Sequence, residues 1–151
     1  TGELVISGEG EMGNYDYNNS SPWKKYKDEI KSVKIEENVT SIGDSAFKGC
    51  TSLTSITIPD SVTSIGYGAF SDCISMESIV IPRSVTTLGD GVFSYCKSLT
   101  TVTFLGDLKS VGSNLFDHCP AISYLVIPQG RKAHFTALLN NSRYAAMLLE
   151  Q

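Results

Sequence analysis

The sequence lacks the features that mark a membrane-spanning or a nucleic-acid-binding protein. Among its 151 residues no apolar run approaches the roughly 18 to 20 residues that a membrane helix needs. Lys and Arg number 12 against 16 Asp and Glu, which gives a formal net charge of −4, whereas nucleic-acid-binding domains usually carry an excess of positive charge. We therefore expect neither insertion of this segment into a membrane nor a nucleic-acid partner.

Residues suited to catalysis are also scarce. Only two histidines occur, His118 and His134. A Cys–His nucleophile needs contact between the two side chains and an exposed thiolate, and His118 is merely the sequence neighbour of Cys119. The acidic residues are scattered, and no glycine-rich phosphate loop opens a helical pattern. The sequence thus predicts a non-enzymatic protein with no catalytic residues and no cofactor.

What the sequence does contain is a repeat of 23 residues. With 41% hydrophobic and 19% charged residues, the composition is that of an ordinary globular protein. Four kinds of residue recur at the same step through the middle of the chain. They are Cys50, Cys73, Cys96 and Cys119; Phe47, Phe70, Phe93 and Phe116; Gly43, Gly66, Gly89 and Gly112; and the apolar residues Ile30, Leu53, Met76, Leu99 and Ile122. A fixed period of this length predicts a solenoid, whose units bury their apolar faces by stacking on one another.

Each unit is predicted to begin with a half-buried strand. Ile56 and Ile58 alternate with Ser55 and Thr57, so the isoleucines point inward and the polar residues outward. Pro59 follows and ends the strand, and Gly66 is expected to allow a later bend. Since neighbouring strands are about 4.8 Å apart, residues one period apart should lie above each other. The phenylalanines should then form an aromatic column. The polar residues after each strand should form a hydrogen-bonded ladder; these are Asn38, Ser61, Ser84 and Asp107.

The four cysteines suggest a metal site, disulfides or buried thiols. Stacking excludes zinc, because the outermost thiols of such a column lie about 14 Å apart, whereas zinc binds each sulfur at about 2.3 Å. Cysteines on neighbouring coils come within disulfide range, but their side chains point the same way. We expect four free, buried thiols that act as small apolar groups, with disulfides as the alternative.

The two ends of the chain depart from the repeat and are predicted to cap it. Residues 1–29 hold an alternating segment followed by Pro22 and Trp23, which suggests a strand, a helix and a tryptophan turned into the first repeat. The repeats occupy residues 30–130. Residues 131–151 carry apolar side chains at helical spacing, broken at Asn140 and Asn141. We expect a single domain, residues 1–151, that is monomeric.

The repeated pattern Ile-Pro-x-Ser-Val-Thr-x-x-Gly-x-x-x-Phe-x-x-Cys, from Ile58 and again from Ile81, resembles the BspA-type leucine-rich repeat family, found mainly on surface proteins of gut and oral anaerobic bacteria. The resemblance implies a right-handed, leucine-rich-repeat-like β-solenoid with short strands, an N-terminal strand and helix cap and a C-terminal helical cap. It further implies an extracellular or cell-surface location and adhesion to a protein partner on a host or bacterial surface. It transfers no binding residues.

Outward-facing strand residues are the main candidates for binding, because a curved solenoid presents them side by side on its concave face. The candidate ligand-binding residues are Ser55, Thr57, Ser78, Val80, Thr101, Thr103, Tyr124 and Val126. The alternative is that such small or β-branched residues simply favour strands. We expect the contact patch near Tyr124 and Val126, where the exposed apolar surface is greatest.

The N-terminal segment offers a second candidate. Tyr15, Tyr17 and Trp23 could stack on a carbohydrate, or they could serve only the cap. Five nearby lysines form a basic segment that could meet an anionic glycan or could be merely solvated; these are Lys24, Lys25, Lys27, Lys31 and Lys34. A purely structural spacer is the third possibility.

Overall fold

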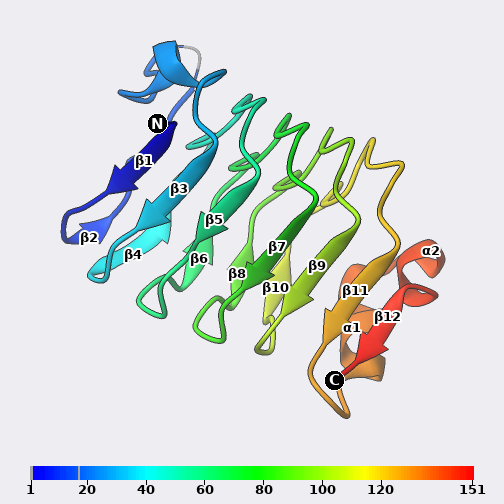
Figure 1. Ribbon diagram of the computed structural model, residues 1–151. Coiled ribbons are helices and arrows are strands. Elements are labelled where there is room, and N and C mark those ends of the chain that lie inside the picture. Colours follow the sequence, from blue (N-terminus) through cyan, green and yellow to red (C-terminus); the bar gives the residue numbers. More distant parts are fainter. Residues whose placement is uncertain (1, 17) are drawn as a thin grey trace.

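In the computed structural model, which describes residues 2–16 and 18–151, the chain winds into a parallel β-solenoid (Figure 1). Each central coil contributes one strand to a long row of strands and a second strand, shorter in all but the first repeat, to a second sheet behind it. The two termini lie at opposite ends of the stack. The predicted solenoid is therefore confirmed.

The long row contains seven strands that lie side by side in Figure 1. They are β1 (Glu3–Ile6), β3 (Ser32–Ile35), β5 (Ser55–Thr57), β7 (Ser78–Ile81), β9 (Thr101–Phe104), β11 (Tyr124–Ile127) and β12 (Leu148–Glu150). The first three are hydrogen-bonded as one sheet and the last four as another. All pairs are parallel, and Ser78 lies opposite Thr101, which lies opposite Tyr124.

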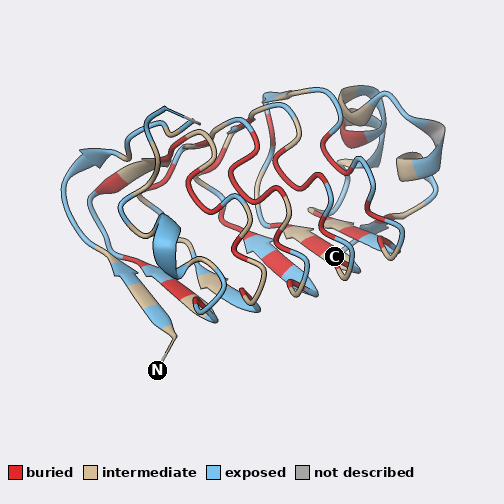
Figure 2. Ribbon diagram, turned by 90° about the horizontal axis from the view of Figure 1, so that it is seen from above, coloured by how far each residue is buried: buried red, intermediate tan, exposed pale blue. Residues whose placement is uncertain are grey.

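The second sheet is built from two- to four-residue strands in the order β10-β8-β6-β4-β2. Their bounds are β2 (Gly10–Glu11), β4 (Val39–Ile42), β6 (Ser64–Ile65), β8 (Thr87–Leu88) and β10 (Ser110–Val111). Buried residues follow the inside of the stacked coils, and buried and exposed positions alternate along the strands (Figure 2). This alternation is the one that the sequence predicts.

The predicted aromatic column runs through the core. Phe47, Phe70, Phe93 and Phe116 are fully buried, and successive ring centroids are 5.6, 5.9 and 5.6 Å apart with interplanar angles of 10°, 6° and 9°. Trp23 continues the stack beyond Phe47 at 5.6 Å. Its indole nitrogen also donates a hydrogen bond to the carbonyl oxygen of Ala46 at 2.8 Å. The prediction that Trp23 turns into the first repeat is confirmed.

The four cysteines are free and buried, as predicted. The thiols of Cys73, Cys96 and Cys119 donate to phenylalanine carbonyl oxygens at 3.3, 3.1 and 2.9 Å. Burial raises the pKa of Cys50 to about 11 and that of Cys96 to about 12. The column thus holds protonated thiols rather than nucleophilic thiolates.

The repeated glycines serve close packing between coils rather than the bend that the sequence suggests. Their φ angles are not in the left-handed region, but a Cβ on Gly89 would lie 2.6 Å from the backbone nitrogen of Tyr67. A Cβ on Gly112 would lie within 2.5 Å of three backbone atoms of the coil before it. Only glycine lets the backbones of successive coils approach this closely.

The expected polar ladder lies at a different place. The hydroxyl oxygens of Ser61 and Ser84 are buried and have no hydrogen-bond partner among the described residues, because the backbone closes that turn itself, as when Val62 N donates to Pro59 O. Carboxylates after the repeated glycines link the coils instead. Asp44 accepts from the amide of Tyr67 at 2.7 Å, and Asp90 accepts from the amide of Ser113 at 2.6 Å.

The N-terminal segment is itself a coil of the solenoid. β1 pairs with β3 and β2 pairs with β4, so both sheets extend to this end. The helix expected after Pro22 is only the three-residue 3₁₀ helix η1 (Lys24–Tyr26). Glu3 lies opposite Ser32, so the first coil is longer than the 23-residue repeat. Its residues therefore do not recur at the 23-residue step in the sequence.

The C-terminal segment forms two short helices, as expected, and then a strand that was not expected. Helix α1 (Lys132–Leu139) ends at Asn140, which adopts a left-handed conformation with φ of 43°, and α2 (Ser142–Ala145) follows. The chain then returns to the long row as β12, where Leu125 lies opposite Leu148. The Glu150 side chain accepts a hydrogen bond from the first amide of α1, at Lys132. The 23-residue step therefore continues to the end of the chain.

Candidate binding surfaces

The eight predicted binding residues lie together on one surface. We call this surface the strand face; it consists of the outward side chains of the long row of strands. Pairing places Ser55 opposite Ser32, and Ser78 opposite Thr101, so that the outward residues form two columns across the strands. Of the eight, Val80 and Tyr124 are the most exposed hydrophobic side chains, each at 52%. Thr101, Thr103 and Val126 are half-buried.

The structure adds residues that the repeat pattern missed. Val5 on β1 lies opposite Lys34, and Leu149 on β12 lies opposite Val126, so one column extends from the first strand to the last. Both are exposed, at 48%. The sequence signal for Leu149 was its position 23 residues after Val126, which was obscured by the helical spacing around it.

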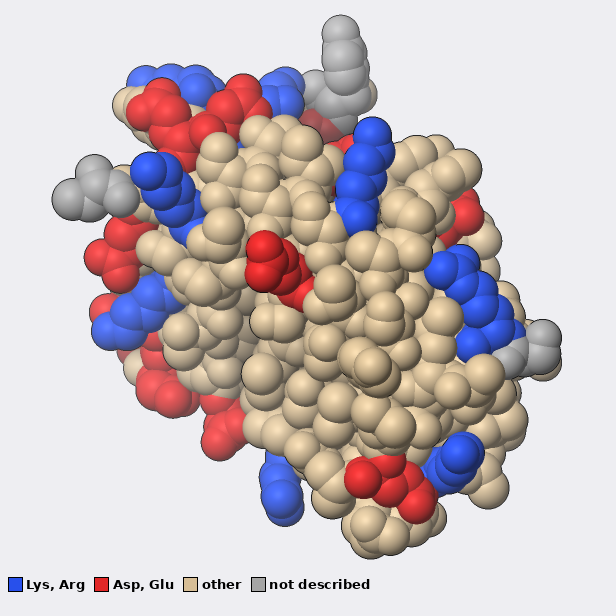
Figure 3. Space-filling model, turned by 45° about the vertical axis from the view of Figure 1, so that its right-hand side comes forward, with Lys and Arg blue, Asp and Glu red and all other residues tan. Residues whose placement is uncertain are grey.

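The C-terminal half of the strand face is uncharged and carries several exposed apolar side chains among its hydroxyl groups. Val126 is flanked by Tyr124 on its own strand and by Leu149 on the next. None of the eight predicted residues carries a charge. Figure 3, which turns the C-terminal side toward the viewer, shows a broad area of uncharged residues with most charged side chains near its margin. Such a surface suits a partner that buries apolar area rather than one held by ion pairs.

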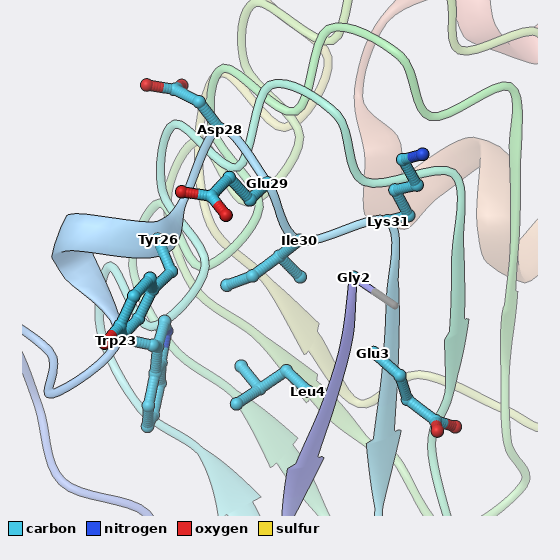
Figure 4. A pocket seen from close by; sticks show the side chains of 9 residues that line it. All are labelled: Gly2, Glu3, Leu4, Trp23, Tyr26, Asp28, Glu29, Ile30 and Lys31. Atoms are coloured by element: carbon cyan, nitrogen blue, oxygen red, sulfur yellow. The ribbon is translucent and has the colours of Figure 1, made fainter.

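The N-terminal aromatic residues are largely occupied by the cap. Tyr15 packs edge-on against Trp23 at 5.5 Å, and Trp23 stacks on Phe47; Tyr17 lies outside the described residues. Burial raises the pKa of Tyr15. A cavity of about 600 Å³ opens at this end of the stack, with Leu4, Ile30 and Trp23 around it (Figure 4). The rings of Tyr15 and Trp23 therefore serve mainly to pack the N-terminal segment against the first repeat.

The five N-terminal lysines do not form one patch. Lys34 lies on the strand face, and Lys31 borders the cavity of Figure 4. The ammonium group of Lys25 sits over the Tyr26 ring, 4.7 Å from its centroid. Of the five, only Lys24 and Lys27 share a site, a second cavity that also includes Lys48, a residue outside the lysine-rich segment of the sequence.

Neither histidine is placed for nucleophilic catalysis. His118 stacks on Tyr95 with ring centroids 4.4 Å apart and lies 3.7 Å from the Asp117 carboxylate, on the surface. Cys119 is 1% exposed, and its thiol donates to the Phe93 carbonyl oxygen. His134 contacts the carbonyl oxygen of Leu108 at 2.7 Å and helps to hold α1 against the solenoid.

Neither a metal-binding cluster nor a membrane-spanning helix occurs among residues 2–16 and 18–151. No group of three or more His, Cys, Asp or Glu side chains is arranged to hold a metal ion. No helix is both long and apolar enough to cross a membrane.

A model of the BspA-type leucine-rich repeat region matches residues 24–143 in six copies. The match covers most of the chain, from η1 in the N-terminal coil through α1 to the start of α2. The chain belongs to the BspA-type leucine-rich repeat family. The curated proteins include none with significant sequence similarity to it.

Solved structures of bacterial leucine-rich repeat proteins share the fold. A leucine-rich repeat protein of T. pallidum is 29% identical with a TM-score of 0.65, over 82% of this chain and 62% of that one. One from Eubacterium ventriosum is 30% identical with a TM-score of 0.68, over 85% and 34%. One from Bacteroides ovatus, 21% identical with a TM-score of 0.71, shows the fold alone. The chain thus spans less than two thirds of the length of each of these proteins.

Proposed function

We propose that this BspA-type domain is a non-catalytic module that binds a partner protein through its strand face, at the surface of or outside a bacterial cell. Its family and fold are those of a repeat scaffold of a kind generally without catalysis, and leucine-rich repeat surfaces serve protein interaction. The location rests on the family's typical surface or secreted character. The partner lies on a host or bacterial surface.

The observation that carries the proposal is the exposed apolar cluster at the C-terminal half of the strand face. Val80, Tyr124 and Leu149 are each about half exposed. Tyr124 and Leu149 lie on adjacent strands, and the register places Val80, Thr103, Val126 and Leu149 in one row across β7, β9, β11 and β12. Because these strands are hydrogen-bonded to one another in one four-stranded sheet, with β11 paired on both sides, these side chains are presented rigidly. A rigid surface loses little conformational entropy on binding, and aromatic residues such as Tyr124 often dominate binding energy.

The test measures binding to purified surface and matrix proteins by biolayer interferometry. The double variant Tyr124→Ala, Val126→Ser should weaken binding of any protein that the native domain captures by about tenfold or more, as expected for an interface centre. Its melting temperature should change little, because Tyr124 is exposed and Val126 is only half-buried. Tyr67→Ala, which removes a 55% exposed tyrosine away from the strand face, is the matched control and should bind normally. Unchanged affinity in the double variant would place the site elsewhere, and failure to bind any protein would favour a structural spacer.

A further inference from the structure

A second cavity, bordered by charged side chains, lies where the N-terminal loop meets the first two repeats. It has a volume of about 510 Å³, within the range of ligand sites in proteins, roughly 300 to 1,000 Å³. Lys24, Lys27 and Lys48 line it together with Asp16 and Asp72. Four Ser and Thr side chains and the Tyr15 ring complete the wall. We call this cavity the lysine pocket.

The three ammonium groups in the lysine pocket are free of carboxylate partners. Among the described residues the ion pairs are Arg131 with Asp107 and His118 with Asp117, and no lysine takes part in one. Lys24 donates to the hydroxyl of Ser20 at 2.8 Å. Lys27 is half-buried, and its ammonium group lies over Gly49, 3.4 Å from where a Cβ would be. Gly49 has φ of 73°, so this position favours glycine and leaves Lys27 uncovered by a side chain.

The two carboxylates of the pocket are fixed and keep a free oxygen. Asp16 accepts with Oδ1 from the backbone amides of Asn18 and Asn19, both at 2.7 Å. Asp72 accepts with Oδ2 from the hydroxyl of Ser71 at 3.1 Å. The second oxygen of each has no hydrogen bond from the described residues. The pocket therefore offers unpaired cationic donors and unpaired anionic acceptors within one hollow.

Three lysines and two aspartates in one cavity favour a ligand that has both a negative charge and hydroxyl donors. A simple anion would be attracted by the lysines and repelled by the two aspartates, and it would leave most of the volume unfilled. A neutral sugar would leave three ammonium groups without a counter-charge. We propose that the lysine pocket binds an acidic sugar unit, with its carboxylate or sulfate among Lys24, Lys27 and Lys48 and its hydroxyl groups donating to Asp16 and Asp72. This site is separate from the strand face and does not depend on it.

The negative net charge of the chain makes binding of an acidic sugar a specific test of the lysine pocket. Because the molecule carries a formal charge of −4, a polyanion is repelled by the molecule as a whole, and binding must come from a local site. The probes are a heparin tetrasaccharide, an oligogalacturonate of the same length and maltotetraose, titrated by calorimetry. The first carries sulfate and carboxylate groups, the second carboxylate alone, and the third no charge. Binding of the oligogalacturonate identifies carboxylate as sufficient, whereas binding of heparin alone identifies sulfate.

Lysine variants locate the site. Lys27→Gln and the pair Lys24→Gln, Lys48→Gln should each weaken binding of the acidic probe by about tenfold or more. Lys97→Gln and Lys109→Gln make the same change of charge at exposed lysines outside the pocket and should leave binding unchanged. Equal losses in both sets would mean diffuse attraction and would overturn the proposal. So would equal binding of maltotetraose, or no binding of either acidic probe.

A carboxylate variant separates an acidic sugar from a simple anion. Asp72 has φ of 61°, a conformation that asparagine tolerates well, so Asp72→Asn should fold normally. It removes a negative charge but also a strong acceptor for sugar hydroxyls. If an acidic sugar binds as proposed, Asp72→Asn weakens it by about threefold or more. If the pocket holds only the anion, the same change tightens binding, inorganic sulfate competes fully, and the proposal fails.

Discussion

At the scale of single residues, the side chains that repeat form the core, and the proposed binding surface consists of side chains that vary between coils. Phe70 stacks between Phe47 and Phe93 and has no exposed surface, whereas Tyr67 in the same coil is 55% exposed. The repeated positions are fixed by burial, so they cannot contact a partner. The residues that vary between coils, such as Val80 and Tyr124, are the ones left to do so.

The first prediction follows from this column of rings. Phe70→Ala should lower the free energy of unfolding by about 3–5 kcal/mol, the range for a buried phenylalanine, because neighbouring coils hold the cavity open. Tyr67→Ala, in the same coil, should lower it by less than about 0.5 kcal/mol. Chemical denaturation measures both. A loss below about 1 kcal/mol for Phe70→Ala would show that the ring column is not the core.

At the scale of elements, the strands are too short to be stable alone. The longest have four residues, and each depends on parallel partners from coils before and after it. This dependence explains β12. Without it, β11 would have an unpaired edge, and an exposed edge invites pairing with another chain. In the C-terminal segment, β12 thus covers the edge of β11 and becomes the last strand of this sheet, and two short helices precede it.

Neighbouring leucines test whether β12 is part of the fold. Leu148 is 4% exposed, whereas Leu149 is 48% exposed. Leu148→Ala should lower the free energy of unfolding by about 2 kcal/mol or more, and Leu149→Ala by less than about 0.5 kcal/mol. The two variants make the same change on opposite sides of the strand. Urea denaturation measures the free energy of unfolding of each. Equal effects would mean that this segment does not pair with β11 as described.

At the scale of the whole molecule, the four thiols form a column through the repeats, and their burial makes stability depend on pH. Burial raises the pKa of Cys50 and of Cys119 to about 11, from 9.0, and that of Cys96 to about 12. Above about pH 9 the unfolded chain therefore loses thiol protons that the folded chain retains. Since the folded state then binds more protons, its stability falls as the pH rises.

This linkage gives a prediction at alkaline pH. Between about pH 9 and 11, each buried thiol should steepen the fall in the free energy of unfolding by up to about 1.4 kcal/mol per pH unit. Tyrosine and lysine titrate there too, so the comparison is with Cys96→Ala, whose slope should be shallower. Denaturation curves at several pH values give both slopes, and identical slopes would contradict the expected burial. Ellman's reagent should find no reactive thiol in the native protein at neutral pH and four in denaturant.

The 23-residue sequence period by itself determined the coil, the strand at the start of each repeat, the ring column and the thiol column. It could do so because parallel stacking brings residues one period apart directly above one another, so a periodic sequence implies a periodic structure. The same argument located the eight candidate residues of the strand face. It failed for Gly66 and Ser61, because whether a position needs close backbone approach or finds a hydrogen-bond partner depends on the neighbouring coil, not on its own repeat.

Only the tertiary structure decided what happens where the period is lost or masked. The first coil has a longer step, so pairing of β1 with β3 could not be seen in the repeat. The helical spacing before Leu148 concealed a strand whose conformation is set by the free edge of β11. The lysine pocket joins Lys24 and Lys27 of the N-terminal segment to Lys48 and Asp72 of two different repeats. Such a site arises from the stacking of unlike segments, and no local pattern in the sequence records it.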